Sequence, residues 1–231
     1  ELELLMKGIV FAEALALILS LYFIRRRFGP FAPKFQFSVW WDFLSRSAPI
    51  GLGVIFSVLY FRLDIVMLQL MTDDKVVGFY SAAYKLFEIV IVLPHSLMIV
   101  LFPSLVEVFH TDREKFKIIL KKAFTVYFVV GSSIALIFFG FSNEIIGLIY
   151  GDNFLFSVKI LEILAIAIAL SFLIFLLSNV LIVSGWEMAN TWSLVGATIL
   201  NSALNLVWIP AHGAIGAAWA TVVCEITLIV I

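Results

Sequence analysis

The sequence contains a series of long apolar runs, and their length restricts the folds that the chain can adopt. A helix that crosses a bilayer needs roughly 20 apolar residues. About seven segments reach that length or fall a few residues short of it. We expect membrane helices at about Leu5–Ile24, Ala48–Met71, Val77–Leu105, Ala123–Phe141, Phe156–Val183, Thr191–Ile209 and Ala214–Ile231.

The composition excludes an ordinary soluble domain. Hydrophobic residues make up 63% of the chain and charged residues 13%, and the mean hydropathy is +1.13. Soluble domains are about 45–50% apolar and about 25% charged. Because the apolar runs are continuous rather than alternating, they favour helices over the strands of a membrane barrel. We therefore predict an all-α, polytopic transmembrane helical bundle.

The two ends of the sequence predict a fragment of a longer protein. The chain begins at Glu1 without an initiator methionine, and its last residue, Ile231, lies inside an apolar run. Residues 1–24 are predicted to be a separate membrane helix, 25–47 a linker, and 48–231 a six-helix lobe.

Basic residues in the predicted loops indicate the orientation. Five lie between the first two helices and five between the third and fourth, whereas the alternate loops contain only Lys75: Arg25, Arg26, Arg27, Lys34, Arg46, Arg113, Lys115, Lys117, Lys121 and Lys122. Since Lys and Arg concentrate in cytoplasmic loops, these two loops are predicted to be cytoplasmic. The protein is expected in the inner (plasma) membrane.

The predicted linker has features of a segment on the cytoplasmic membrane surface. Pro30 and Pro33 interrupt any helix, and Trp40 and Trp41 suit an interfacial amphipathic piece. The Arg25–Arg27 cluster either binds anionic lipid headgroups or simply ends a membrane helix on the cytoplasmic side.

Arg62 and Asp64 lie only two residues apart inside the second apolar run. Charged residues in membrane helices are rare, and they usually face a bundle interior or a water-filled cavity. With about 1.5 Å of rise per residue, Asp64 and Lys85 both lie roughly 10–12 Å from the outer surface on neighbouring antiparallel helices. Arg62 and Glu88 match at roughly 14–16 Å. We therefore predict two ion pairs, Asp64 with Lys85 and Arg62 with Glu88.

Helix geometry limits this prediction. Residues two apart point about 200° from one another, so only one of Arg62 and Asp64 can face the third helix directly. Arg62 is the better candidate for the cavity, because a guanidinium binds phosphate through two parallel hydrogen bonds. A buried ion network that only locks the bundle is the alternative.

Other polar residues of the apolar segments are weaker candidates. Lys159 is a candidate cavity residue, although it can also extend to the membrane interface. Glu162 is assigned to ion pairing, and Glu13 and Glu225 to ion pairing or to proton or cation coupling. Asparagines at 179, 201 and 205 are interpreted as interhelical hydrogen-bonding groups.

Nothing in the sequence indicates an enzyme. His95, His110 and His212 lack metal-ligand spacing, Cys224 is the only cysteine, and no nucleophile motif or glycine-rich phosphate loop is present. We predict no catalytic residue, no metal site and no nucleic-acid partner. Pro94, near the middle of the third helix, suits a kinked helix of the kind found in transporters.

Several motifs resemble those of polysaccharide-biosynthesis flippases of the O-antigen and exopolysaccharide type, within the multidrug/oligosaccharidyl-lipid/polysaccharide (MOP) exporter superfamily. They occur between about residues 45 and 225 and include YFRLDIVML at 60–68, VGFYSAAYKL at 77–86, LFPSL at 101–105, IYGDNF at 149–154, NLVWIP at 205–210 and GAIGAAWAT at 213–221.

The resemblance implies a MATE-like fold with two lobes of six helices. Residues 1–24 would then be the last helix of the amino-terminal lobe, and 48–231 the carboxy-terminal lobe. It also implies a flippase that moves a polyprenyl-pyrophosphate-linked oligosaccharide from the inner to the outer leaflet by alternating access, driven by a Na⁺ or H⁺ gradient. Expected partners are this substrate, membrane lipids and other polysaccharide assembly proteins; no bound cofactor is expected.

Three alternatives stay open from the sequence. A multidrug or organic cation antiporter of the same superfamily would favour an acidic cavity, whereas Arg62 and Lys85 suit a pyrophosphate. A membrane glycan polymerase or ligase would usually need a larger outer loop than about Ser142–Phe154. A membrane scaffold would leave the charges of the apolar segments unexplained.

Overall fold

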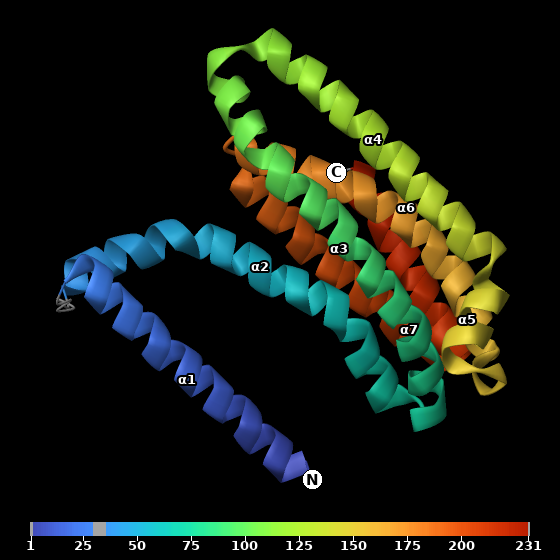
Figure 1. The fold of residues 1–231 in the computed structure, drawn as a ribbon. Coiled ribbons are helices and arrows are strands. Elements are labelled where there is room, and N and C mark those ends of the chain that lie inside the picture. Colours follow the sequence, from blue (N-terminus) through green and yellow to red (C-terminus); the bar gives the residue numbers. More distant parts are fainter. Residues whose placement is uncertain (1, 30–35, 231) are drawn as a thin grey trace. The chain divides into compact units, whose positions relative to one another are not determined.

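The computed structural model describes residues 2–29 and 36–230, and these residues are almost entirely helical (Figure 1). They contain no strand, so the predicted all-α class is confirmed. The order of elements is α1 (Leu2–Phe28), α2 (Phe37–Met71), α3 (Asp74–Thr111), α4 (Arg113–Gly140), α5 (Ser142–Tyr150), the 3₁₀ turn η1 (Asp152–Phe154), α6 (Phe156–Val183) and α7 (Glu187–Val230).

The helices have the lengths and apolar composition that a multi-pass membrane protein needs. Six segments of the described chain are long and apolar enough to cross a membrane: Met6–Phe28, Gly51–Met71, Asp74–Thr111, Arg113–Gly140, Phe156–Val183 and Glu187–His212. A shorter apolar helix, Ala214–Val230, follows. These seven pieces correspond to the seven predicted segments. Their many exposed apolar side chains are suited to contact with lipid.

Gly213 divides α7 into the last two of these pieces. Its φ of 57° and ψ of −134° lie outside the helical region, and only glycine adopts such angles at low cost. Pro210 precedes the kink and also weakens the local helix, because it has no N–H to donate. The sequence GAIGAAWAT therefore begins a new helix.

The predicted interfacial piece before the second membrane helix is part of α2. Trp40 and Trp41 lie in its first turns, and the ring of Trp41 stacks on Phe37 with 6.4 Å between centroids. Pro30 and Pro33 lie outside the described residues. The chain separates into two compact units, Glu1–Arg46 and Ser47–Ile231, so the boundary falls within α2. The assignment of these units to two transporter lobes stays a prediction.

Helix α6 lies at the centre of the second unit, where it packs against α3, α4 and α7. Leu164, Ile168 and Phe172 are completely buried there. Because apolar side chains lie on all sides of α6 and polar ones are few, it suits a position surrounded by other helices. Helix α4 approaches it closely at Gly131, which lies against Phe172.

Short turns fix α3 between its neighbours. Asp73 accepts a hydrogen bond from the Val76 backbone N–H (2.8 Å) at the start of α3. Asp112 caps α4 in the same manner through the Lys115 N–H (3.0 Å). The Tyr127 hydroxyl of α4 donates a hydrogen bond to the backbone carbonyl of Pro94 in α3 (2.9 Å). These turns make α2, α3 and α4 successive antiparallel helices.

Candidate functional site

Arg62, Lys85 and Glu88 form a charged cluster between α2 and α3. The Arg62 guanidinium lies 3.0 Å from Glu88 Oε1, and Lys85 Nζ lies 3.1 Å from Glu88 Oε2. The predicted Arg62–Glu88 ion pair is therefore present. One carboxylate faces two cations, so the cluster keeps an excess of positive charge.

Asp64 does not form the predicted pair with Lys85, and that part of the prediction is wrong. Its side chain is 1% exposed. It accepts hydrogen bonds from the Tyr80 hydroxyl (2.9 Å), the Asn205 amide (2.7 Å) and the Thr221 hydroxyl (2.9 Å). The Asn205 amide also donates to Asn201 Oδ1 (2.9 Å). We call these five residues the Asp64 cluster.

The two charges of α2 point in different directions, as their spacing predicts. The side chain of Arg62 is 58% exposed, whereas that of Asp64 is buried among α3 and both halves of α7. Asp64 therefore fastens α2 to the bundle through neutral donors. Tyr80 and Thr221 were not identified from the sequence, since a tyrosine and a threonine in a membrane helix carry no distinctive signal.

Arg62, Lys85 and Glu88 line an open recess of about 460 Å³ on the surface of α2 and α3. Apart from Ser57, its other walls are apolar and include Phe61 and Ile91. The recess thus combines a cationic rim with apolar sides, which suits an amphiphilic anion.

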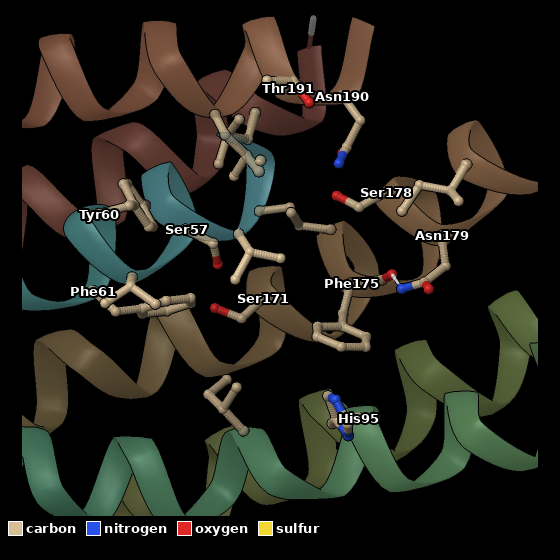
Figure 2. A pocket seen from close by; sticks show the side chains of 18 of the residues that line it. Ser57, Tyr60, Phe61, His95, Ser171, Phe175, Ser178, Asn179, Asn190 and Thr191 are labelled. Atoms are coloured by element: carbon tan, nitrogen blue, oxygen red, sulfur yellow. Dashed lines mark hydrogen bonds between the residues drawn. The ribbon is translucent and has the colours of Figure 1, made fainter. Parts of the chain in front are cut away.

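A second, more enclosed cavity of about 360 Å³ lies between α2, α3, α6 and α7 (Figure 2). Its lining mixes apolar side chains with hydroxyl, amide, imidazole and carboxyl groups, contributed by Ser57, Tyr60, His95, Ser171, Ser178, Asn179, Glu187, Asn190, Thr191 and Glu225. In Figure 2 the hydroxyls of Ser57 on α2 and Ser171 on α6 point into the space between these helices.

Glu225 is the buried carboxylate of this second cavity. It is 2% exposed, and Tyr60 donates a long hydrogen bond of 3.4 Å to its Oε1. Its other oxygen, Oε2, has no hydrogen-bond partner among the described residues, and neither has Ser171 Oγ. The sequence singled out Glu225 as an acidic candidate but could not place it in a cavity.

The remaining sequence candidates lie elsewhere. Lys159 Nζ is 3.0 Å from Glu162 Oε2, one turn along α6, and neither residue lines the recess or the second cavity. The Lys159 side chain is 66% exposed, so it is free to extend toward the interface. Glu13 is exposed on α1. Their roles in binding or coupling stay predictions.

Comparison with known proteins finds one similarity in sequence and one in fold. Residues 3–109 match the model of a family described as "Polysaccharide biosynthesis protein". No curated protein matches the chain significantly. Among solved structures, the fold is similar to the "outward-facing conformation of a multidrug resistance MATE family transporter of the MOP superfamily", with a TM-score of 0.71 and 16% identity.

That similarity covers 80% of this chain but 42% of the transporter, so the chain spans less than half of the length of the protein it resembles. At 16% identity the likeness establishes the fold alone. The chain is therefore similar to the polysaccharide-biosynthesis family over residues 3–109, and its fold is similar to that of a multi-pass transporter of the MATE type.

Proposed function

We propose that the chain is part of a flippase that moves a lipid-linked oligosaccharide of the polyprenyl-pyrophosphate type from the inner to the outer leaflet. The observation that carries this proposal is the recess with Arg62 and Lys85 on its rim. Both residues lie within the part of the chain that matches the polysaccharide-biosynthesis family. A transporter-like family and fold also favour a function without catalysis.

The chemistry of the recess suits a pyrophosphate. A guanidinium presents parallel N–H donors to phosphate oxygens, and an ammonium adds a compact point charge. Glu88 holds both cations in place without neutralising them completely, since it supplies one negative charge against two positive charges. The apolar walls beside them can contact the polyprenyl chain.

The proposed transport cycle is alternating access between two lobes in the inner membrane, driven by a Na⁺ or H⁺ gradient. In transporters of this general type, rigid groups of helices rock around a central site. Membrane lipids and other polysaccharide assembly proteins are the proposed partners.

Complementation with the full-length protein tests the role of Arg62. We expect Arg62→Ala to abolish most surface polysaccharide and Arg62→Lys to retain part of it, because lysine keeps the charge but not the paired donors. Lys117→Ala is the control, since Lys117 is exposed and its only described ion pair is with Glu114, also on the surface. With expression matched by immunoblot, normal polysaccharide from both Arg62 variants would exclude a phosphate-binding role.

A multidrug or organic cation antiporter is the second candidate, and the second cavity favours it. Glu225 and Glu187 line that cavity together with Tyr60, Phe61 and Phe175, and aromatic rings with a carboxylate suit an organic cation. Resistance to cationic dyes distinguishes the candidates: an antiporter loses resistance in Glu225→Gln, whereas a flippase shows no dye resistance that depends on expression.

A further inference from the structure

We propose that Lys121 and Lys122 of α4 bind the phosphate of an anionic phospholipid at the membrane surface. The site lies near the end of α4 that joins α3 (Figure 1), on the side that the basic loops predict to be cytoplasmic. It goes beyond the proposed function, because it concerns a resident lipid bound outside the charged recess rather than the transported molecule.

The charge distribution along α4 is the first support. Five of its first ten residues are lysine or arginine: Arg113, Lys115, Lys117, Lys121 and Lys122. The rest of the helix, residues 123–140, has no charged residue. Clusters of about four to eight basic residues directly beside a membrane helix are typical of proteins that bind anionic lipids. One end of α4 presents such a cluster, and the other end does not.

The length of α4 places the inner part of this cluster near the lipid headgroups. The helix has 28 residues, which span roughly 42 Å at about 1.5 Å per residue, whereas the hydrocarbon core is about 30 Å thick. The uncharged residues 123–140 span roughly 27 Å and therefore account for most of the core. Lys121 and Lys122 directly precede them, at the boundary between hydrocarbon and headgroups.

Exposed apolar side chains lie beside both lysines on the membrane side. Residues three, four or seven positions apart share a face of a helix. Lys121 therefore shares a face with Phe124 and Phe128, and Lys122 shares one with Val126. These three apolar side chains are 44–52% exposed, which suits contact with acyl chains. The surface thus offers a cation for a lipid phosphate and an apolar track for the chains attached to it.

The neighbouring basic residues differ from these two lysines because they have partners. The Arg113 guanidinium lies 3.8 Å from the ring centroid of Phe109, and Lys117 Nζ lies 2.7 Å from Glu114 Oε1. None of the ion pairs among the described residues includes either of the two proposed ligands, and both are exposed. Two adjacent cations without a protein counterion, at the level of the headgroups, favour an anion supplied by the membrane.

The opposite face of α4 is packed against the bundle, which fixes the direction of the lysine-bearing face. Phe116, Ala123 and Tyr127 are buried, and the Tyr127 hydroxyl donates to the Pro94 carbonyl (2.9 Å). Because α4 cannot turn about its axis without breaking these contacts, the two lysines stay directed away from the bundle. The site is therefore a fixed surface of the protein.

Native mass spectrometry of the full-length protein in detergent tests the site. Phosphatidylglycerol is titrated into the delipidated protein, and phosphatidylcholine, which has no net charge, is titrated as the control lipid. The wild type is expected to bind phosphatidylglycerol more tightly than phosphatidylcholine. The difference should decrease as the salt concentration rises, because salt screens contacts between exposed charges.

The double variant Lys121→Gln with Lys122→Gln removes both charges and keeps polar side chains. Each basic residue near an anionic surface strengthens binding roughly fivefold, so the apparent Kd for phosphatidylglycerol is expected to rise roughly 25-fold. Lys121→Arg with Lys122→Arg keeps both charges and is expected to bind as the wild type does. Lys75→Gln is the matched control, since it removes an exposed lysine from the first turn of α3 and should leave the Kd unchanged.

Several results would overturn the proposal. Equal affinity of the wild type for the two lipids is one, and an unchanged Kd in the folded double Gln variant is another. Displacement of phosphatidylglycerol by inorganic phosphate at a similar concentration would indicate a phosphate site to which acyl chains contribute nothing. If the double Gln variant does not fold, the lipid comparison and the double Arg variant still test the site. None of these measurements uses the oligosaccharide, so this proposal and the flippase proposal can fail separately.

Discussion

At the scale of single residues, the neighbours of each intramembrane charge determine what that charge can do. Arg62 is half exposed and shares Glu88 with Lys85. The guanidinium N–H groups that do not face Glu88 are therefore available to a ligand. Asp64 is enclosed by neutral donors. Glu225 is enclosed but nearly without donors. We propose a phosphate-binding role for Arg62 and infer a structural role for Asp64.

The structural role of Asp64 predicts a loss of stability in Asp64→Ala. The substitution leaves the hydroxyls of Tyr80 and Thr221 and the amide of Asn205 without their acceptor. Each unsatisfied buried group costs about 1–3 kcal/mol, so we expect unfolding in detergent at a clearly lower temperature. Thermal unfolding followed by circular dichroism measures the change.

Glu114→Ala is the control for Asp64→Ala. Glu114 is exposed and its ion pair with Lys117 lies on the surface, and exposed pairs of this kind contribute about 0–1 kcal/mol. Equal unfolding temperatures for Asp64→Ala and Glu114→Ala would show that the Asp64 cluster does not hold the helices together.

At the scale of helices, close packing around α6 and the kink in α7 depend on single glycines. A Cβ at Gly131 would lie 2.8 Å from Phe172 Cβ and Cγ, which is too close for unstrained packing. Gly213 has a backbone conformation that other residues adopt only with strain. Gly131 therefore permits the close contact of α4 with α6, and Gly213 permits the kink at which the last helical piece begins.

Gly131→Ala is expected to destabilise the bundle by about 1–3 kcal/mol, because overpacking forces α4 and α6 apart. Gly140→Ala, in the same helix, is the matched control. No atom lies within 4 Å of a Cβ at Gly140, and alanine favours helix by up to about 1 kcal/mol relative to glycine. Thermal unfolding of the two variants should therefore shift in different directions; a stable Gly131→Ala would contradict the observed packing.

Gly213→Ala is expected to cost about 1–3 kcal/mol through backbone strain rather than through a clash. The nearest side-chain atom to a Cβ there, Val76 Cγ1, is at 3.7 Å, an ordinary contact. Gly196→Ala is the control, since Gly196 lies in the same long helix with helical angles and open space around it. If both variants unfold at the wild-type temperature, the kink does not require glycine.

At the scale of the whole molecule, the sequence predicts which segments form membrane helices, because that depends on hydropathy. It does not predict which neighbour each side chain faces, because that depends on how each helix is oriented about its own axis. Membrane segments follow from runs of apolar residues, and the Arg62–Glu88 pair follows from matching depths on adjacent helices. Depth alone could not show that Asp64 turns away from Lys85. Its partners Asn205 and Thr221 are 141 and 157 residues away, and no local pattern links them to Asp64.

The second cavity illustrates the same limit. Glu225 is visible in the sequence as an acidic residue in an apolar run, yet its cavity is formed by residues from four helices. The packing of these four helices determines which carboxylate oxygen of Glu225 lacks a hydrogen-bond donor. A sequence pattern can therefore nominate a buried carboxylate, but only the tertiary arrangement distinguishes a satisfied one from an unsatisfied one.

The predicted orientation of the chain can be tested by cysteine labelling. Cys224, the only cysteine of this chain, is fully buried, so it gives little background. In the full-length protein, with any cysteine outside this chain replaced, Asn153→Cys and Lys117→Cys each introduce one exposed thiol. Because basic loops stay in the cytoplasm, a membrane-impermeant maleimide is expected to label Asn153→Cys in intact cells and Lys117→Cys only after permeabilisation. The reverse pattern would invert the orientation and would place Arg62 and Lys85 in the cytoplasmic half of the membrane, where they would meet the pyrophosphate as it enters rather than as it leaves.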